Sequence, residues 1–282
     1  MTLSKPQISN YHETGYLFIE NVFDEEEVQR LLKEMESIIT ENCEQRILEK
    51  NGAVRSFFSP ESKSKLFADL IRLDRLVYPA KQLLRSEVYK HQTKLNTKQA
   101  LMGDWWEWHQ DFIYWNKEDG MQEPNVVTAM IYLNDVNEFN GPLVVIPGSH
   151  KKGQIDISAN KAQSSKGNDW FSKYVQSKNY MSSLTTNLKY TLKDNMLSEM
   201  IKGNGLSSIK GPAGSVVFFH GNLFHASSNN LSPWNRYTFL ITYNSIENKL
   251  SHMERPRPSF ISNRDFEAIS SIRDLPITDN AI

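Results

Sequence analysis

The fold of this chain is constrained most by a series of short apolar segments punctuated by glycine and proline. They cover residues 126–133, 143–146, 215–220, 224–227 and 236–244. Asn-Gly-Pro at 140–142 and Gly-Pro-Ala-Gly at 211–214 mark turns in front of two of them. Many short strands with such turns are typical of a β-sandwich or barrel. We therefore expect a mainly β protein built on two sheets.

The region before residue 88 differs, because its longer apolar segments have helical spacing. Residues 24–40 predict a helix with Asp24 as N-cap and Glu27 completing a capping box. Residues 63–84 predict a second helix by the same spacing. We expect these helices to buttress the β core. Two short strands are expected beside them, at residues 15–19 and 54–58.

Composition narrows the class of protein. The chain has 282 residues, enough for a large core, and its formal net charge of −1 gives no electrostatic reason to bind nucleic acid or an anionic membrane. It has no apolar run of 18 residues and no signal-peptide pattern, so we expect no membrane partner. Cys43 is its single cysteine, which suits a reducing compartment, and we expect a cytoplasmic location.

Residues 105–115 contain four of the six tryptophans of the chain. If this stretch is a strand, His109 and Asp111 face the same side, because residues two apart in a strand share a face. Aromatic rings would then enclose an imidazole and a carboxylate, which indicates a metal site. A His-x-Asp/Glu triplet is expected roughly once by chance in such a chain, so the hypothesis depends on a third ligand.

Two later histidines, His220 and His225, are candidates for that third ligand. We favour His225, because Ser227 and Arg236 follow it, and expect His220 to be a core or supporting histidine. Two imidazoles and one carboxylate suit non-haem Fe(II) and oxygen chemistry, although zinc uses the same ligand types. Such an iron enzyme needs an electron-donating cosubstrate. Arg236 and Ser227 predict a site for the far carboxylate of a 2-oxo dicarboxylate.

Residues 88–97 alternate like a strand, and one of the two faces is polar. That face carries Lys90, Gln92, Lys94 and Asn96. Polar side chains facing inward indicate a wet or ligand-filled interior, whereas the alternative is an edge strand with one face in water.

Several motifs resemble the phytanoyl-CoA dioxygenase superfamily of Fe(II)/2-oxoglutarate-dependent oxygenases. They are His109-Gln-Asp111, Asn140-Gly-Pro-Leu-x-x-Ile-Pro-Gly-Ser-His150 and His225-x-Ser-x-Asn-x-x-Ser-Pro-x-x-Arg236. Within this superfamily the chain looks most like bacterial trans-4 proline hydroxylases and ectoine hydroxylases, over about residues 10–262. The resemblance implies a double-stranded β-helix, or jelly roll, with a cupin-like core.

The resemblance also implies roles for individual residues. His109, Asp111 and His225 would bind Fe(II), with O2 and 2-oxoglutarate as cosubstrates and ascorbate as a supporting reductant. The residues matching 2-oxoglutarate contacts are Arg236, Ser227, Asn96, Thr128, Lys94 and Trp106. Those assigned to the substrate pocket are Gln92, Trp115 and Phe58, with Arg55 added as a candidate for the substrate carboxylate.

A free L-amino acid, proline or another small one, is the substrate class that the resemblance implies. Lys94 and Leu240 stand where ectoine hydroxylases carry an arginine and an aromatic residue, and this difference favours proline-like substrates over ectoine. The alternatives are an ectoine hydroxylase, an oxygenase that modifies a peptide-bound or natural-product amino acid, and a non-catalytic metal-binding protein on the same fold. We expect a monomer or a homodimer.

We expect one oxygenase domain over residues 1–282. In it, residues 1–87 form the helical buttress with the first strands, and 88–150 and 206–248 form the jelly-roll core. Residues 151–205, rich in Ser, Asn and Lys, are predicted to be an insertion and a candidate lid. Residues 249–282 form a C-terminal tail.

Overall fold

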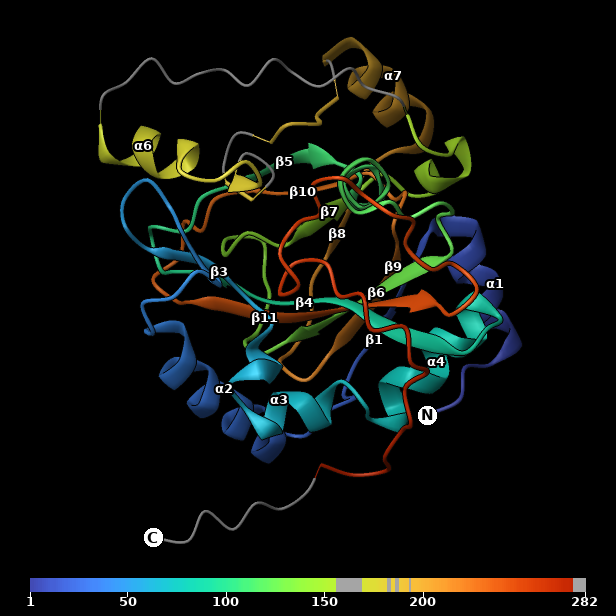
Figure 1. The fold of residues 1–282 in the computed structure, drawn as a ribbon. Coiled ribbons are helices and arrows are strands. Elements are labelled where there is room, and N and C mark those ends of the chain that lie inside the picture. Colours follow the sequence, from blue (N-terminus) through green and yellow to red (C-terminus); the bar gives the residue numbers. More distant parts are fainter. Residues whose placement is uncertain (156–168, 182–183, 186–187, 193, 276–282) are drawn as a thin grey trace, which may run out of the picture.

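The computed structural model describes residues 1–155, 169–181, 184–185, 188–192 and 194–275. Its strands form two antiparallel sheets, which confirms the expected mainly β fold (Figure 1). The 7-stranded major sheet has the order β1 (Tyr16–Ile19), β9 (Val216–His220), β6 (Val126–Tyr132), β11 (Arg236–Ser245), β4 (Val88–Lys98), β3 (Val54–Phe58) and β2 (Arg46–Leu48). The 4-stranded minor sheet has the order β5 (Trp106–His109), β10 (His225–Ser227), β7 (Leu143–Val145) and β8 (Ser207–Ile209).

The two sheets face each other and share an apolar core. Met130, Phe219 and Leu240 of the major sheet pack there with Leu143 and Val145 of the minor sheet. Polar side chains of β4 and β11 also lie between the sheets, as the alternation in residues 88–97 predicts for an interior face.

Helices cover the outer face of the major sheet and the far side of the minor sheet (Figure 1). The first group packs on the major sheet and consists of α1 (Lys5–Thr14), α2 (Glu25–Ile39), α3 (Lys65–Leu70) and α4 (Asp74–Leu84). Asp24 and Glu27 form the predicted capping box at the start of α2. The second group contains α6 (Trp170–Gln176) and α7 (Asp194–Asn204). The described residues also include the short 3-10 turns η1 (Pro60–Ser62) and η3 (Ser149–Lys152).

The prediction of one helix over residues 63–84 is wrong, because α3 and α4 are separate. Residues 71–73 leave the helical path, and Leu73 has an extended backbone with ψ of 132°. The C-terminal tail pairs with this break. Asp74 donates its backbone N–H to the Ile272 carbonyl at 2.8 Å, and Ile272 donates to the Arg72 carbonyl at 2.9 Å. A tertiary partner thus overrides helical spacing that is continuous in the sequence.

The prediction of one strand over residues 105–115 is also wrong. Strand β5 ends at His109, and the chain continues as α5 (Asp111–Tyr114) and the π-helix η2 (Trp115–Asp119). Phe112, Ile113 and Tyr114 are all at most 5% exposed, which the alternating faces of an exposed strand do not allow. The Phe112 N–H donates to the Gly221 carbonyl at 2.9 Å and fixes the turn.

The predicted insertion at 151–205 contributes α6 and α7, which lie above the minor sheet in Figure 1. Parts of it, at 156–168, 182–183, 186–187 and 193, lie outside the described residues, and so does the end of the tail at 276–282. Among the described residues, no helix has both the length and the apolar character needed to cross a membrane.

Candidate active site

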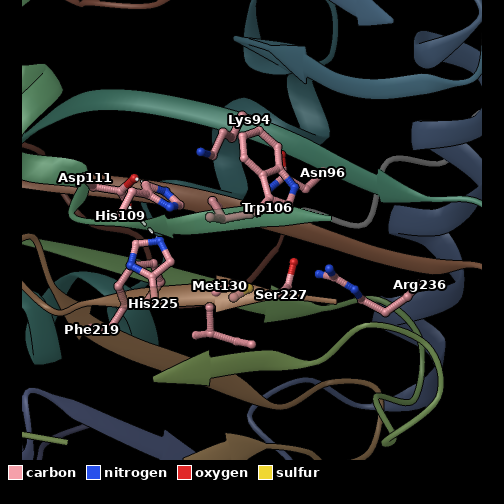
Figure 2. A pocket seen from close by; sticks show the side chains of 13 residues that line it. Lys94, Asn96, Trp106, His109, Asp111, Met130, Phe219, His225, Ser227 and Arg236 are labelled. Atoms are coloured by element: carbon pink, nitrogen blue, oxygen red, sulfur yellow. Dashed lines mark ion pairs between the residues drawn. The ribbon is translucent and has the colours of Figure 1, made fainter. Parts of the chain in front are cut away.

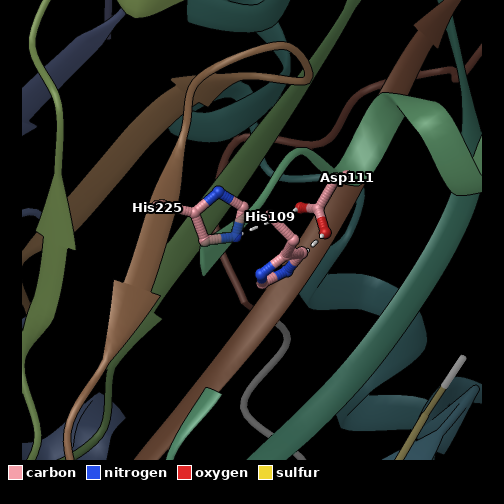
Figure 3. Close-up of side chains that lie close together, drawn as sticks. All are labelled: His109, Asp111 and His225. Atoms are coloured by element: carbon pink, nitrogen blue, oxygen red, sulfur yellow. Dashed lines mark ion pairs between the residues drawn. The ribbon is translucent and has the colours of Figure 1, made fainter. Parts of the chain in front are cut away.

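Two strands and one helix bring His109, Asp111 and His225 together (Figure 3). Nε2 of His109 lies 3.5 Å from one carboxylate oxygen of Asp111, and Nε2 of His225 lies 3.9 Å from the other. The three ligand atoms lie within 4.8 Å of one another, and each residue is at most 9% exposed. Two imidazoles and one carboxylate on one side of a point form the facial arrangement that non-haem iron uses.

Backbone carbonyls orient both imidazole rings. Nδ1 of His109 lies 2.6 Å from the Glu107 carbonyl, and Nδ1 of His225 lies 2.9 Å from the Leu223 carbonyl. Since a carbonyl only accepts, each Nδ1 carries the proton and each Nε2 keeps its lone pair. The register of the minor sheet places His225 directly opposite His109. Both lone pairs are therefore available at the same point beside Asp111.

Asp111 and His225 remain in the protonation states that metal binding needs. Burial alone would raise the pKa of Asp111, but His225, His109 and Lys94 outweigh it and hold this pKa well below its usual range. Burial, together with His109, lowers the pKa of His225 to about 4. At neutral pH the site thus presents a carboxylate and a neutral imidazole, which are the forms that coordinate metals.

Gln110 holds the turn between the two ligands on its chain segment. Its side-chain amide donates to the Asn222 carbonyl at 2.7 Å and to the Gly153 carbonyl at 2.9 Å. Its side-chain oxygen accepts the N–H of Ile155 at 3.1 Å. The sequence reasoning missed this role, because the contacts come from segments more than forty residues away.

A cavity of about 430 Å³ extends from the triad to Arg236, and we call it the Arg236 cavity (Figure 2). Ser227 and Arg236 lie at the end away from the triad, and Lys94, Asn96 and Trp106 line another wall. Nε of Arg236 and the hydroxyl of Ser227 are buried without a hydrogen-bond partner. Arg236 donates only a long bond of 3.4 Å to Thr238, and burial lowers its pKa to about 10. A buried cation beside an unpartnered hydroxyl fits a carboxylate ligand.

A second cavity, of about 390 Å³, opens on the other side of the triad, and we call it the Arg257 cavity. It shares Lys94, Trp106, His109 and Asp111 with the Arg236 cavity. Its other walls come from distant parts of the chain: Phe58, Gln92, Tyr114, Trp115, Leu184, Leu188 and Arg257. A metal at the triad would therefore face two separate ligand spaces.

Arg257 is the residue of this second cavity that the sequence reasoning missed. Its Nε and Nη2 donate to the two carboxylate oxygens of Asp119 at 2.7 and 2.6 Å. Asp119 is fully buried at the end of the π-helix η2, and it also lies 3.3 Å from Nε2 of His91. Nη1 of Arg257 lies 3.8 Å from Glu118, beyond hydrogen-bond distance. The available signal is the Arg-Pro-Arg-Pro run at 255–258, within the predicted C-terminal tail, where Arg257-Pro also resembles the proline hydroxylases.

Comparison with known proteins agrees with this geometry. The model of the family "Phytanoyl-CoA dioxygenase (PhyH)" matches residues 11–237. The chain belongs to the phytanoyl-CoA dioxygenase family. It is 36% identical to an L-proline trans-4-hydroxylase of Streptomyces griseoviridis over 94% of this chain and 96% of the relative. It is 35% identical to an ectoine dioxygenase of Bordetella bronchiseptica over 98% of this chain and 88% of the relative.

Solved structures identify the jelly-roll core and the cofactors. EctD from S. alaskensis with 2-oxoglutarate and 5-hydroxyectoine matches with a TM-score of 0.79 and 27% identity, over 96% of this chain and 88% of that one. EctD with bound Fe matches with a TM-score of 0.77. The protein is an Fe(II)- and 2-oxoglutarate-dependent dioxygenase of this family. The His-Asp-His group is the only cluster of metal-ligating residues found in the part of the chain that the structure describes.

Two residues assigned to ligands from the sequence do not line either cavity. Arg55 is fully buried behind Trp106, stacked 3.6 Å from its ring and paired with Glu49 at 2.8 Å. Its charge is already neutralised, so it supports the Trp106 wall and does not reach a substrate carboxylate. Thr128 lies deeper on the inner face of β6, with its hydroxyl 3.1 Å from that of Thr242. The other predicted ligand contacts all line one or both cavities.

Proposed function

We propose that this dioxygenase hydroxylates a free, small L-amino acid of the proline type. The observation that carries the proposal is the pair of cavities that meet at the triad. One cavity ends in an unpaired buried arginine that suits a dicarboxylate, and the other is a small, largely aromatic space. The likeness to a proline hydroxylase over nearly the whole chain supports the choice of substrate class.

In this proposal His109, Asp111 and His225 hold Fe(II), since their free lone pairs meet at one point. Iron(II), 2-oxoglutarate and O2 together supply the oxidising power for C–H hydroxylation, with release of succinate and CO2. Arg236 and Ser227 bind the far carboxylate of 2-oxoglutarate. Lys94 and Asn96 contact the cosubstrate nearer the metal, and Trp106 separates its space from that of the substrate.

Arg257 binds the substrate carboxylate in the Arg257 cavity, and Gln92 accepts a hydrogen bond from the substrate N–H. Arg257 has both nitrogens of one edge committed to Asp119, so its Nη1 is the group that remains for a ligand. Gln92 has its amide nitrogen committed to the Ile261 carbonyl at 2.7 Å, which leaves its oxygen for a substrate N–H. Among the described residues, Asp111 is the only acid that lines this cavity. A substrate cation must therefore rest against aromatic rings such as Trp115 and Phe58.

These aromatic side chains also exclude water from the reacting C–H bond. Leu184 and Leu188, from the predicted insertion, complete the wall on the open side. We propose that this part of the insertion acts as a lid, since both leucines are at most 6% exposed and line the cavity. The two sheets, the insertion and the tail all contribute to one site, which supports a single oxygenase domain over residues 1–282.

A second candidate substrate is ectoine, because several relatives are ectoine dioxygenases. Lys94 lines the Arg257 cavity and stands where ectoine hydroxylases carry an arginine, which favours proline. The test is to incubate the protein with Fe(II), 2-oxoglutarate, ascorbate and single candidates: the 20 protein L-amino acids, L-pipecolate, L-citrulline and ectoine. Mass spectrometry should detect a gain of one oxygen and an equal amount of succinate for L-proline or a close analogue. Turnover of ectoine alone, or of none of the panel, would contradict the proposal.

A further inference from the structure

Lys98, the last residue of β4, is a buried cation that belongs to neither cavity wall. Its side chain is 1% exposed. The ammonium donates to the Asp104 carbonyl at 2.5 Å and to the Ser228 carbonyl at 2.7 Å. These carbonyls belong to the loop before β5 and the loop after β10, so Lys98 links the major sheet to the minor sheet. Ser228 directly follows Ser227, whose unpartnered hydroxyl lines the Arg236 cavity.

Two glycines pack closely against Lys98 and its aliphatic side chain. A Cβ at Gly103 would lie 2.7 Å from the Lys98 Cα, and a Cβ at Gly141 would lie 2.8 Å from its Cδ. Gly141 also has φ of +77°, which disfavours other residues. Two glycines from different loops thus enclose the aliphatic stem, and Gly141 belongs to the Asn-Gly-Pro motif at 140–142, which the proposed function leaves unexplained.

Lys98 lies directly opposite Arg236 in the register of β4 and β11. Cross-strand partners point to the same face, so two cations lie side by side at the end of the Arg236 cavity. Glu49 and Asp104 act on Lys98 as counter-charges, but their effect on its pKa is smaller than that of burial and of Arg236. Burial first, and then Arg236, hold the pKa of Lys98 well below its usual range. A neutral donor would link the two carbonyls without this repulsion, so the positive charge itself requires an explanation.

An anion bound at Arg236, next to Lys98, provides that explanation. Repulsion between buried like charges destabilises the free protein, and a carboxylate at Arg236 would relieve it. We propose that Lys98 is a positioning residue that acts with Arg236 to select a cosubstrate with a distal carboxylate. It adds a second positive charge beside Arg236, and it fixes Ser227 through the Ser228 carbonyl. This inference rests on the proposed binding of 2-oxoglutarate at Arg236.

The test compares two ligands that differ only in the distal carboxylate, 2-oxoglutarate and 2-oxopentanoate. Calorimetry on the Fe(II)-loaded protein without O2 gives the affinity for each. In Lys98→Met, the affinity for 2-oxoglutarate should fall at least about 10-fold, because the distal carboxylate loses one of the two positive charges that attract it. The affinity for 2-oxopentanoate should stay within about 2-fold, because that ligand has no charge at this end.

Lys98→Gln serves as the second variant, since it keeps a donor for the carbonyls while it removes the charge. It should lose selectivity for 2-oxoglutarate as Lys98→Met does, and it provides the test if Lys98→Met does not fold. Equal weakening of both ligands, or unchanged selectivity in the folded variant, would refute the role of Lys98. Arg236→Gln distinguishes an error in the proposed binding of 2-oxoglutarate from an error in the role of Lys98. If that variant keeps its preference for 2-oxoglutarate, the proposed cosubstrate pose is wrong; if it loses the preference and the Lys98 variants do not, only this inference fails.

Discussion

Asp119 and Glu118 are adjacent carboxylates that both face Arg257, and they should differ greatly in their contribution to stability. Asp119 is fully buried and binds Arg257 through two short hydrogen bonds of 2.7 and 2.6 Å. Glu118 lies 3.8 Å from Arg257, and its side chain is 13% exposed. Asp119→Asn leaves a buried guanidinium without its counter-charge, which costs about 3–5 kcal/mol in the free energy of unfolding. Glu118→Gln should cost less than Asp119→Asn, because Glu118 makes no hydrogen bond to Arg257 and its direct partner, Lys189 at 3.0 Å, is 34% exposed.

Urea denaturation of the two variants measures this difference. The double variant Asp119→Asn/Arg257→Met should recover part of the loss, because it removes the unpaired charge together with its partner. Both single variants should raise the KM for the amino-acid substrate and leave the KM for 2-oxoglutarate unchanged, with the larger effect in Asp119→Asn. Equal costs for the two single variants, or no recovery in the double variant, would refute the assignment of Asp119 as the residue that orients Arg257.

The stabilisation by Asp119 should also depend on pH in a defined direction. Burial would raise its pKa, but Arg257 and His91 outweigh it and hold the pKa of Asp119 well below the ordinary 3.8. A depressed pKa in the folded state stabilises the protein above the unfolded pKa, and this contribution is lost as the pH falls toward the folded pKa. The stability difference between the wild type and Asp119→Asn should therefore be constant above about pH 5 and shrink below about pH 4.

Three further predictions concern the site itself. Arg236→Gln should raise the KM for 2-oxoglutarate about 100-fold in steady-state kinetics, because it removes a charge-assisted carboxylate contact; an increase of less than about 3-fold would contradict the role of Arg236. Gln110→Ala should weaken Fe(II) binding by about 10-fold in a competitive chelator titration, because it releases the turn between His109 and Asp111; unchanged iron affinity would count against it. Leu188→Ala should raise the KM for the amino acid several-fold without changing that for 2-oxoglutarate, and the reverse pattern would place Leu188 on the wrong cavity.

The sequence predicted local features well where their cause is local. The capping box at Asp24 forms because Asp24 and Glu27 satisfy each other's backbone within one turn. The polar face of residues 88–97 does face the interior, since Gln92, Lys94 and Asn96 line the cavities. His109 and Asp111 do lie together as predicted, but the predicted cause, a shared strand face, is wrong. A strand-to-helix turn, fixed by the Gly221 carbonyl, brings them together rather than strand alternation.

Features that depend on distant pairing were not predictable from periodicity. The break between α3 and α4 requires Ile272, about two hundred residues away in sequence. The roles of Arg55 and Arg257 were likewise not predictable, because the local sequence around each is apolar or irregular and does not reveal its ion-pair partner. Their partners decide their roles: Glu49 neutralises Arg55 behind Trp106, whereas Asp119 orients Arg257 at the wall of a cavity.

The central claim is that the His109, Asp111 and His225 site couples the decarboxylation of 2-oxoglutarate to the hydroxylation of an amino acid. Turnover of L-proline under 18O2 tests it most directly, with mass spectrometry of both products. The account predicts one labelled oxygen atom in hydroxyproline and one in the succinate formed with it, and neither product with His109→Ala. Unlabelled hydroxyproline would contradict the claim, and so would full turnover by His109→Ala. Formation of succinate without any oxygenated amino acid, with the whole substrate panel present, would also contradict it.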